Sequence, residues 1–190
     1  MAQEGLRLSA SAAAPVAQES LRLVSHSIAS HDGRLPRQYT AEGQGAKKDM
    51  SPALEWYGVP EGTRSLALVA QDIDADPAVP WTHWVVANIP PDTKGLPEGF
   101  SGKEGAAGRE FGGLQEGVND WKQPGWRGPV LPSRGHRIQF KLYALDDELH
   151  LGNKVRCSLL KSDSGSYWRT HTGVLIRLVC HDFLFFLKIF

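Results

Sequence analysis

The segment HRIQFKLYAL, His136 to Leu145, alternates apolar and polar residues, and this pattern constrains the fold more than any other feature of the chain. A period of two is that of a β-strand with one buried face. One face carries Ile138, Phe140, Leu142 and Ala144, and the other carries Arg137, Gln139, Lys141 and Tyr143. The segment is therefore predicted to be a half-buried strand.

Other apolar runs also have the length and composition of strands. Ser65 to Gln71, SLALVAQ, is nearly continuous in apolar residues, which predicts a strand buried on both faces. Trp81 to Ile89, WTHWVVANI, is rich in aromatic and β-branched residues and ends before two prolines. Shorter strands are predicted at Leu21 to Ile28 and around Leu54 to Trp56.

The chain contains 190 residues with 20 glycines and 12 prolines, which suits one domain with many turns. No stretch up to Leu151 shows a helical period over ten or more residues, and the glycine-rich segment Gly95 to Gly113 is predicted to be a long loop. These observations predict a mainly β fold in which long loops carry the function.

The charges balance, with 21 Lys and Arg against 21 Asp and Glu. Zero net charge disfavours nucleic acid or an anionic membrane as the main partner, so any anion must bind in a local pocket. Two cysteines, Cys157 and Cys180, form neither a metal-type pair nor a disulfide framework. The simplest explanation of this cysteine content is a reducing compartment, so a cytoplasmic location is predicted.

The ends of the chain differ from the middle. Residues 1–20 lack an apolar signal-peptide core and carry Glu4 and Arg7, so they are predicted to be a disordered leader. An organelle transit peptide is the alternative, because the leader is rich in Ser and Ala and poor in acid. The apolar run Gly173 to Phe190 is interrupted by charges and is too short for a transmembrane helix.

Polar residues gather where three predicted segments begin or end. Asp72, Asp74 and Asp76 follow one strand, His83 lies near the start of the next, and a Gly/Pro loop runs into His136. A carboxylate beside an imidazole favours the protonated ring, which can donate hydrogen bonds to phosphate or carboxylate. Taken alone, the acids are more typical of a solvated turn, and His83 and His136 are more typical of hydrogen-bonded core residues than of ligand contacts. A metal site is a less favoured interpretation, because the sequence has no local pair of metal ligands such as His-Glu-x-x-His.

Several motifs, in order and spacing, resemble the phosphatidylethanolamine-binding protein family. They read MSPALEWYGVPEGTRSLALVAQDIDAD, THWVVANIPP, LPEGF, GVNDW and GWRGPVLPSRGHRIQFKLYALD, and together they cover about Leu21 to Val155. The likeness is greatest to the bacterial-type branch, which also occurs in plants. The resemblance implies a large central antiparallel sheet, a smaller second sheet and few short helices.

The resemblance also implies a ligand pocket. Asp72 and Asp74 match the two acids of the family's Asp-Pro-Asp segment, and His83 matches its strand histidine. Gly128 and Pro129 match a Gly-Pro element, and His136 matches the histidine of Gly-x-His-Arg. Residues at the pocket rim are expected to be Trp81, Trp84 and Ile138. Ile73 replaces the family's proline, and Ile138 replaces a tyrosine, which makes the wall more apolar.

The expected domain is 21–155, and residues 156–190 form a tail that does not match the family ending. The predicted function is non-enzymatic binding of a small anion, such as phosphate or a phospholipid head group, without cofactor or metal. An interaction module that inhibits a kinase or protease, or acts as a signalling scaffold, is the alternative. A small hydrolase is a weaker one, because no Gly-x-Ser-x-Gly elbow supports Ser51 or Ser133.

Overall fold

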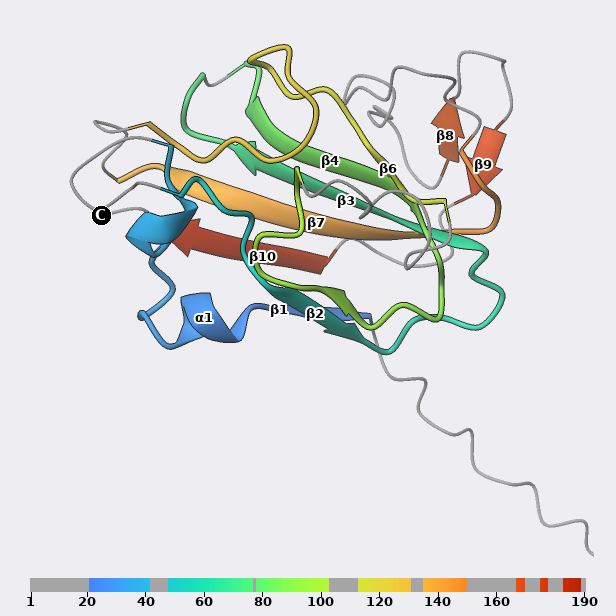
Figure 1. The fold of residues 1–190 in the computed structure, drawn as a ribbon. Coiled ribbons are helices and arrows are strands. Elements are labelled where there is room, and N and C mark those ends of the chain that lie inside the picture. The colour runs from blue at the N-terminus through green and yellow to red at the C-terminus, as the bar shows by residue number, and fades with distance from the viewer. Residues whose placement is uncertain are drawn as a thin grey trace, which may run out of the picture.

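The computed structural model describes residues 21–41, 48–76, 78–102, 113–130 and 135–149, together with the backbone of three strands between 167 and 188. The predictions for residues 1–20, Ser133, Cys157 and Cys180 lie outside the described residues. Strands dominate the described ranges (Figure 1). They are β1 (Arg22–Val24), β2 (Leu54–Tyr57), β3 (Ser65–Asp72), β4 (Trp81–Ile89), β5 (Gly95–Leu96), β6 (Gln115–Glu116), β7 (Arg137–Leu145), β8 (Tyr167–Arg169), β9 (Leu175–Arg177) and β10 (Phe183–Lys188), with one α-helical turn, α1 (His26–Ala29), and one 3₁₀ turn, Arg37–Tyr39.

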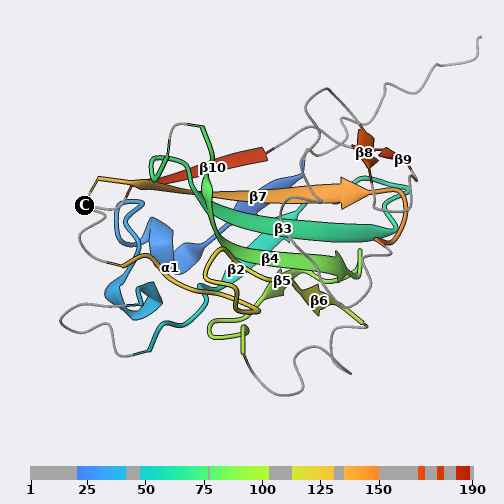
Figure 2. The same cartoon turned by 90° about the horizontal axis from the view of Figure 1, so that it is seen from above.

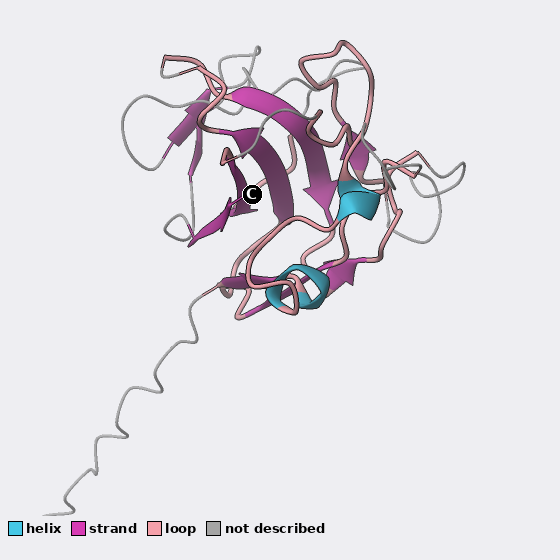
Figure 3. Cartoon of the chain, turned by 90° about the vertical axis from the view of Figure 1, so that its left-hand side faces the viewer, coloured by secondary structure: helices cyan, strands magenta, loops and turns pink. Residues whose placement is uncertain are grey.

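The strands form antiparallel sheets, which confirms the predicted mainly β fold with a large and a smaller sheet. The large sheet has the order β10-β7-β3-β4-β6, and the second sheet has the order β1-β2-β5. A separate pair joins β8 and β9. Seen from above, the second sheet lies across one face of the large one (Figure 2), and an end-on view shows the two layers (Figure 3).

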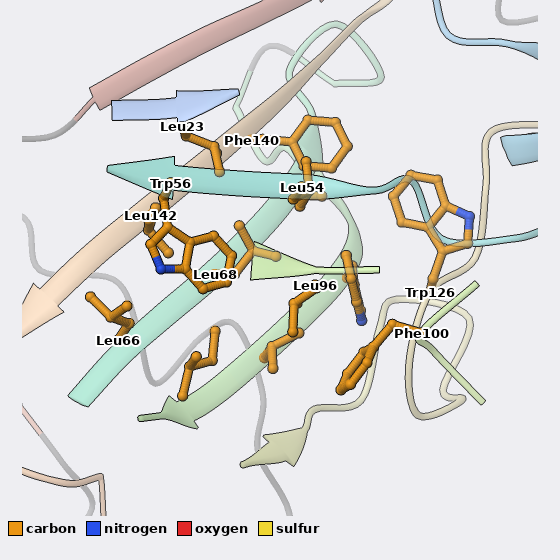
Figure 4. Close-up of a cluster of buried hydrophobic side chains, with 14 of the residues drawn as sticks. Leu23, Leu54, Trp56, Leu66, Leu68, Leu96, Phe100, Trp126, Phe140 and Leu142 are labelled. Atoms are coloured by element: carbon orange, nitrogen blue, oxygen red, sulfur yellow. The ribbon is translucent and has the colours of Figure 1, made fainter. Parts of the chain in front are cut away.

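The main apolar core lies between these two sheets (Figure 4). Trp56 and Leu54 of β2 enter it from the second sheet, and Leu66, Leu68, Phe140 and Leu142 enter it from the large sheet. A second apolar cluster lies on the other face of the large sheet, and it includes Ala67 and Val69 of β3. Every residue of β3 is therefore buried, as its continuous apolar run predicts.

The outward face of β7 is more buried than its alternation predicts. Gln139 is 6% exposed and Tyr143 is 9% exposed, whereas both were expected to face solvent. The second apolar cluster includes Tyr143 and Leu145, so this face also packs against protein. Polar residue types on one side of β7 thus indicated solvent, whereas that side joins an apolar cluster shared with β3 and β4.

The N-terminal strand is shorter than predicted. It spans only Arg22–Val24, paired with β2, and residues from His26 form a helical turn. The turn directs Ile28 into the core, where it is fully buried. The expected loop from Gly95 likewise begins with a strand, β5, because Gly95 pairs with Glu55 of β2.

The last described strand, β10, forms the edge of the large sheet beside β7. Its register runs from Phe183 opposite Leu142 to Lys188 opposite Arg137. The backbone of this segment therefore extends the sheet by one strand. That residues 156–190 differ from the family ending stays a prediction, since most of them lie outside the described residues.

Candidate functional site

Three strand ends of the large sheet meet at Asp72. Asp72 ends β3, and its Cα partners are Trp81 at the start of β4 and Ile138 near the start of β7. Antiparallel pairing brings the end of one strand beside the start of its neighbours. Polar residues that are distant in sequence are therefore neighbours at this end of the sheet.

The carboxylate of Asp72 holds His136. Oδ2 of Asp72 lies 2.7 Å from Nδ1 of His136, and Oδ1 accepts the backbone N–H of Asp74 at 2.9 Å. Asp72 is only 4% exposed, whereas one third of the His136 side chain is exposed. A buried carboxylate thus fixes the orientation of a ring that reaches solvent.

This contact also determines which nitrogen of His136 is accessible for binding. An ionised carboxylate only accepts hydrogen bonds, so Nδ1 carries the proton that points to Asp72. Among the described residues no group bonds to Nε2. Nε2 is therefore the atom that can donate to a guest when the ring is protonated.

His83 sits at a β-bulge in β4. Ala70 pairs with Trp84 and Gln71 pairs with Thr82, so His83 is the extra residue on its strand. A bulge re-aims side chains that would otherwise alternate between faces. Here the rings of both His83 and Trp84 lie near Trp126, at centroid distances of 6.0 Å and 5.9 Å.

His83 is held by the loop that precedes Gly128. Its Nδ1 lies 2.5 Å from the carbonyl oxygen of Arg127, and the Arg127 N–H donates to the His83 carbonyl at 3.1 Å. Burial lowers the pKa of His83, while the Arg127 carbonyl and the nearby carboxylates of Asp72 and Asp120 act in the opposite direction. His83 is 2% exposed, which favours a neutral ring that donates from Nδ1 to the carbonyl.

Asp120 and Trp121 complete this side of the cluster, although the sequence did not single them out. Oδ2 of Asp120 accepts the N–H of Thr82 at 2.7 Å. The Trp121 ring lies 5.0 Å from that of His83 and forms an edge contact with Trp81 at 5.4 Å. Both residues belong to GVNDW, one of the motifs that carry the family resemblance, but nothing in the spacing of that motif indicates that it reaches His83.

The side chain of Asn119 organises this loop. Its Nδ2 donates to the carbonyl of Gly125 at 3.0 Å, and its Oδ1 accepts from the N–H groups of Trp121 and Gln123. Asn119 is 2% exposed, so a buried amide with satisfied hydrogen bonds fixes the turn. The position of Trp121 against His83 follows from this turn.

The Gly128–Pro129 element is tied to the segment that follows β1. The N–H of Gly128 donates to Oδ1 of Asp49 at 2.7 Å, and the carbonyl of Pro129 accepts from Ala41 at 3.2 Å. A Cβ at residue 128 would overlap the backbone of Tyr39. Glycine is therefore required here for close approach, and its N–H is already used by Asp49.

Asp49 is another residue that the sequence did not single out. Burial raises the pKa of its carboxyl, and the Gly128 N–H and the Arg127 guanidinium oppose this rise. Asp49 lies 79 residues before Gly128 and stands in no motif of paired acids, so only the fold brings the two together.

Asp74 is paired with Arg137. Its Oδ2 accepts from the backbone N–H of Arg137 at 2.7 Å and from Nε at 2.9 Å, and its Oδ1 accepts from Nη2 at 2.8 Å. These hydrogen bonds lower the pKa of Asp74 to about 2. The pair fastens the loop after β3 to the start of β7. Both oxygens expected to bind a ligand are engaged by Arg137.

The three residues expected at the rim have different positions. Trp81 is 41% exposed, so part of its side chain reaches the surface, and its position at a rim stays a prediction. Trp84 and Ile138 are fully buried in the main apolar cluster, and the indole N–H of Trp84 donates to Oε1 of Glu116 at 2.7 Å. The strand register explains this, because both pair with core-facing positions of β3.

Two further features of the described ranges bear on the class of site. They contain no group of three or more His, Cys, Asp or Glu residues arranged to hold a metal ion. The helices found there are also too short to carry the chain across a bilayer.

Comparison with known proteins identifies the family. The family model for phosphatidylethanolamine-binding protein matches residues 25–168. A UPF0098 protein of Methanothermobacter thermautotrophicus is 48% identical over 119 residues, which cover 63% of this chain and 73% of the relative. The UPF0098 protein YbhB of Escherichia coli is 37% identical over 130 residues, 67% of this chain and 80% of the relative.

A solved structure gives the same result. The crystal structure of Escherichia coli YbcL, described as a new member of the mammalian PEBP family, superposes with a TM-score of 0.60 at 26% identity. The match covers 90% of this chain and all of YbcL. Motifs, sheet topology and comparisons agree, and the chain belongs to the phosphatidylethanolamine-binding protein family.

Proposed function

We propose that the cluster of Asp72, His83 and His136 binds a small anionic group, either phosphate or the phosphate of a phospholipid head group, and that it does so without turnover. The observation that carries this proposal is the Asp72–His136 contact at 2.7 Å. It leaves Nε2 of a partly exposed histidine as a donor of fixed direction once the ring is protonated.

The charges at the cluster make binding depend on protonation. Asp72 alone would repel an anion, and a neutral His136 would present a lone pair at Nε2. A protonated His136 offsets the charge of Asp72 and turns Nε2 into a donor. Affinity should therefore be higher for the protonated ring than for the neutral ring.

The other two elements support the wall of the site. His83 is buried and bonded to the Arg127 carbonyl, so its ring has a fixed position beside Trp121. Gly128 permits the approach of the 37–40 segment, and its N–H serves Asp49. In this proposal His136 is the contact residue, while His83 and Gly128 hold the neighbouring segments in place.

The catalytic alternative would need one of two serines, Ser51 or Ser133, as its nucleophile. Ser51, one of the two serines considered, is 1% exposed, and its hydroxyl accepts the N–H of Ser101 at 3.0 Å. The interaction-module alternative uses residues 95–128, of which 103–112 lie outside the described residues. That alternative and the cytoplasmic location stay predictions.

The test is calorimetric titration of inorganic phosphate and phosphoethanolamine into the 190-residue chain. His136→Ala should lower the affinity at about pH 5.5 by tenfold or more, as expected for a charge-assisted hydrogen bond of about 1.5–3 kcal/mol. His31→Ala is the matched control, because His31 is an exposed histidine whose Nδ1 lies 2.7 Å from the carbonyl of Ser27. Equal affinity of His136→Ala and wild type for both probes would remove the site assignment.

A further inference from the structure

The segment that forms β1 has a near copy earlier in the chain. Residues 19–24 read Glu-Ser-Leu-Arg-Leu-Val, and residues 4–9, called the leader copy here, read Glu-Gly-Leu-Arg-Leu-Ser. The glutamate, both leucines and the arginine stand at the same places in the two segments. A strand signal resides in this local alternation of apolar and polar residues. The leader copy therefore carries the same strand signal as β1.

The two leucines are what β1 and the residue before it contribute to the core. Leu21 is 1% exposed and Leu23 is 3% exposed, and both belong to the main apolar cluster. Arg22 stands between them and is exposed. In the register of β1, the Leu-Arg-Leu of the leader copy would direct two leucines toward the same part of the core and the arginine away from it.

The strand β1 is a short edge strand, which makes it exchangeable. It has three residues, and its ladder partner in the second sheet is β2 (Figure 1). Leu23 is opposite Trp56 in this ladder. Short elements at an edge open at a lower free energy than strands paired on both sides. One ladder of three residues is therefore all that must open before another segment can pair with β2.

The residues after β1 are fixed separately. Oγ of Ser25 donates to the carbonyl of Ala53 at 2.7 Å, and Ile28 is fully buried. The leader copy is followed by alanine at both corresponding places, Ala10 and Ala13, so it offers neither the hydroxyl nor the large side chain. An exchange is therefore confined to the strand, and the arrangement seen in the structure is the favoured one.

We infer that the leader copy is a spare β1: in a minor state of the same chain, residues 7–9 take the place of Arg22–Val24 beside β2. In that state residues 10–24 form a loop that returns to Ser25. Loop-closure entropy rises only with the logarithm of loop length, so a longer loop opposes the exchange weakly. The exchange keeps leucines at this edge of the core whenever β1 opens.

The first experiment tests whether one leucine replaces the other. Urea unfolding of the 190-residue chain is measured for Leu23→Ala, Leu8→Ala and the double variant. Leu8→Ala alone should change the unfolding equilibrium constant by less than about twofold, because the favoured state does not use it. A buried Leu→Ala change shifts that constant by about thirtyfold or more. The double variant should therefore exceed the product of the single effects by about tenfold.

A control separates the leader copy from the rest of the leader. Val16→Ala removes apolar surface from the leader at a position outside the copy. Its effect should combine additively with that of Leu23→Ala, since Val16 has no counterpart in β1.

Cross-strand cysteines detect the exchanged state directly, in a chain whose own two cysteines are replaced by serine. Arg22 is the Cα partner of Tyr57, so residue 7 should be opposite Tyr57 after the exchange. Opposite residues of an antiparallel pair have Cα atoms about 4.5–5.5 Å apart, which a disulfide can bridge. Arg7→Cys with Tyr57→Cys should form a disulfide within one chain, about tenfold faster when Leu23→Ala is also present.

The matched control is Ala13→Cys with Tyr57→Cys, because the exchange leaves residue 13 in the loop. It should cross-link slowly with or without Leu23→Ala. Additive effects of Leu8→Ala and Leu23→Ala, or equal cross-linking of residues 7 and 13, would overturn the inference. A disulfide that joins two chains would also overturn it, in favour of strand exchange between copies. If Leu23→Ala does not fold, the comparison of residues 7 and 13 in the otherwise unchanged chain decides alone.

Discussion

Nδ1 of His136 lies 2.7 Å from Oδ2 of Asp72, although the two residues are 64 positions apart in the chain. The pairing of β3 with β7 places them together, because Asp72 is opposite Ile138 and His136 precedes β7 directly. One contact thus links the end of a buried strand to a ring at the surface. The predictions below test this link and the elements around it.

Asp72→Ala should destabilise the protein and abolish phosphate binding. The change leaves the Asp74 N–H and the His136 ring without their acceptor at a buried position, which costs about 1–3 kcal/mol. Urea unfolding gives the stability, and calorimetry gives the affinity. Asp72→Asn is the control, since its amide oxygen can still accept from Asp74. Phosphate affinity in Asp72→Ala equal to that of wild type would show that Asp72 does not orient His136 for binding.

The stability of the protein should fall as the pH is lowered from about 6.5. Burial lowers the pKa of His83 in the folded state, so the unfolded chain binds more protons below the ordinary value of about 6.5. The stabilising effect of the neutral ring is complete above that pH and is lost toward the folded pKa. One such proton gives a slope of at most about 1.4 kcal/mol per pH unit.

The pH series is measured by urea unfolding between about pH 5 and pH 7.5 in wild type and His83→Gln. Glutamine can still donate to the Arg127 carbonyl but does not titrate, so the slope should be smaller in this variant. His31→Ala, at an exposed position, should keep the wild-type slope. An unchanged slope in His83→Gln would place its origin in another group.

Asp74→Asn should lower the free energy of unfolding at neutral and mildly acid pH, but it should change the phosphate affinity little. The hydrogen bonds from Arg137 lower the pKa of Asp74 to about 2 from 3.8. Its stabilising effect is therefore present above about pH 4 and is lost between about pH 4 and pH 2. Between about pH 4 and about pH 2, the unfolding midpoint should therefore change less in Asp74→Asn than in wild type. Asp92→Asn, at an exposed turn, is the control. A large loss of phosphate affinity in Asp74→Asn would instead make Asp74 a ligand contact.

Gly128→Ala should be among the most damaging single-methyl additions in the chain. The new Cβ would overlap the Tyr39 carbonyl and the Cα of Thr40, both of which are backbone atoms that cannot rotate away. Overpacking of this kind costs about 1–3 kcal/mol or more. Gly33→Ala provides a comparison, because its φ of +73° is strained for alanine but nothing lies within 4 Å of the added Cβ. Thermal unfolding should place Gly128→Ala below Gly33→Ala, and the reverse order would contradict the close approach at Gly128.

The strands were predictable because their signals are local. The apolar run of β3 and the aromatic and β-branched run of β4 show their burial within eight or nine residues. The face of β7 that carries Gln139 and Tyr143 was predicted wrongly, because it continues an apolar surface to which the neighbouring strands contribute Ala67 and Val85. Period and residue type describe a single strand, but they do not report the residues that lie beside it on the same face of the sheet.

The candidate site was predictable to the level of residue type and chain order. Asp72 and His136 were named from their motifs and are in contact. The bulge at His83 was not foreseeable, because it depends on a shift of register between β3 and β4 that no local pattern encodes. Asp49, Asp120 and Trp121 were missed because each meets its partner, Gly128, Thr82 or His83, from another part of the chain.

The sequence by itself determined that the chain forms a mainly β domain with acids and histidines at the ends of its strands. Only the tertiary structure decided which of those groups remain available to a ligand. Arg137 donates to the carboxylate of Asp74, and the N–H of Gly128 donates to Asp49. Nδ1 of His83 is hydrogen-bonded to the Arg127 carbonyl. A strand signal depends on neighbours along the chain, whereas a hydrogen bond selects its partner by proximity in space, and each of these three partners lies at least 44 residues away.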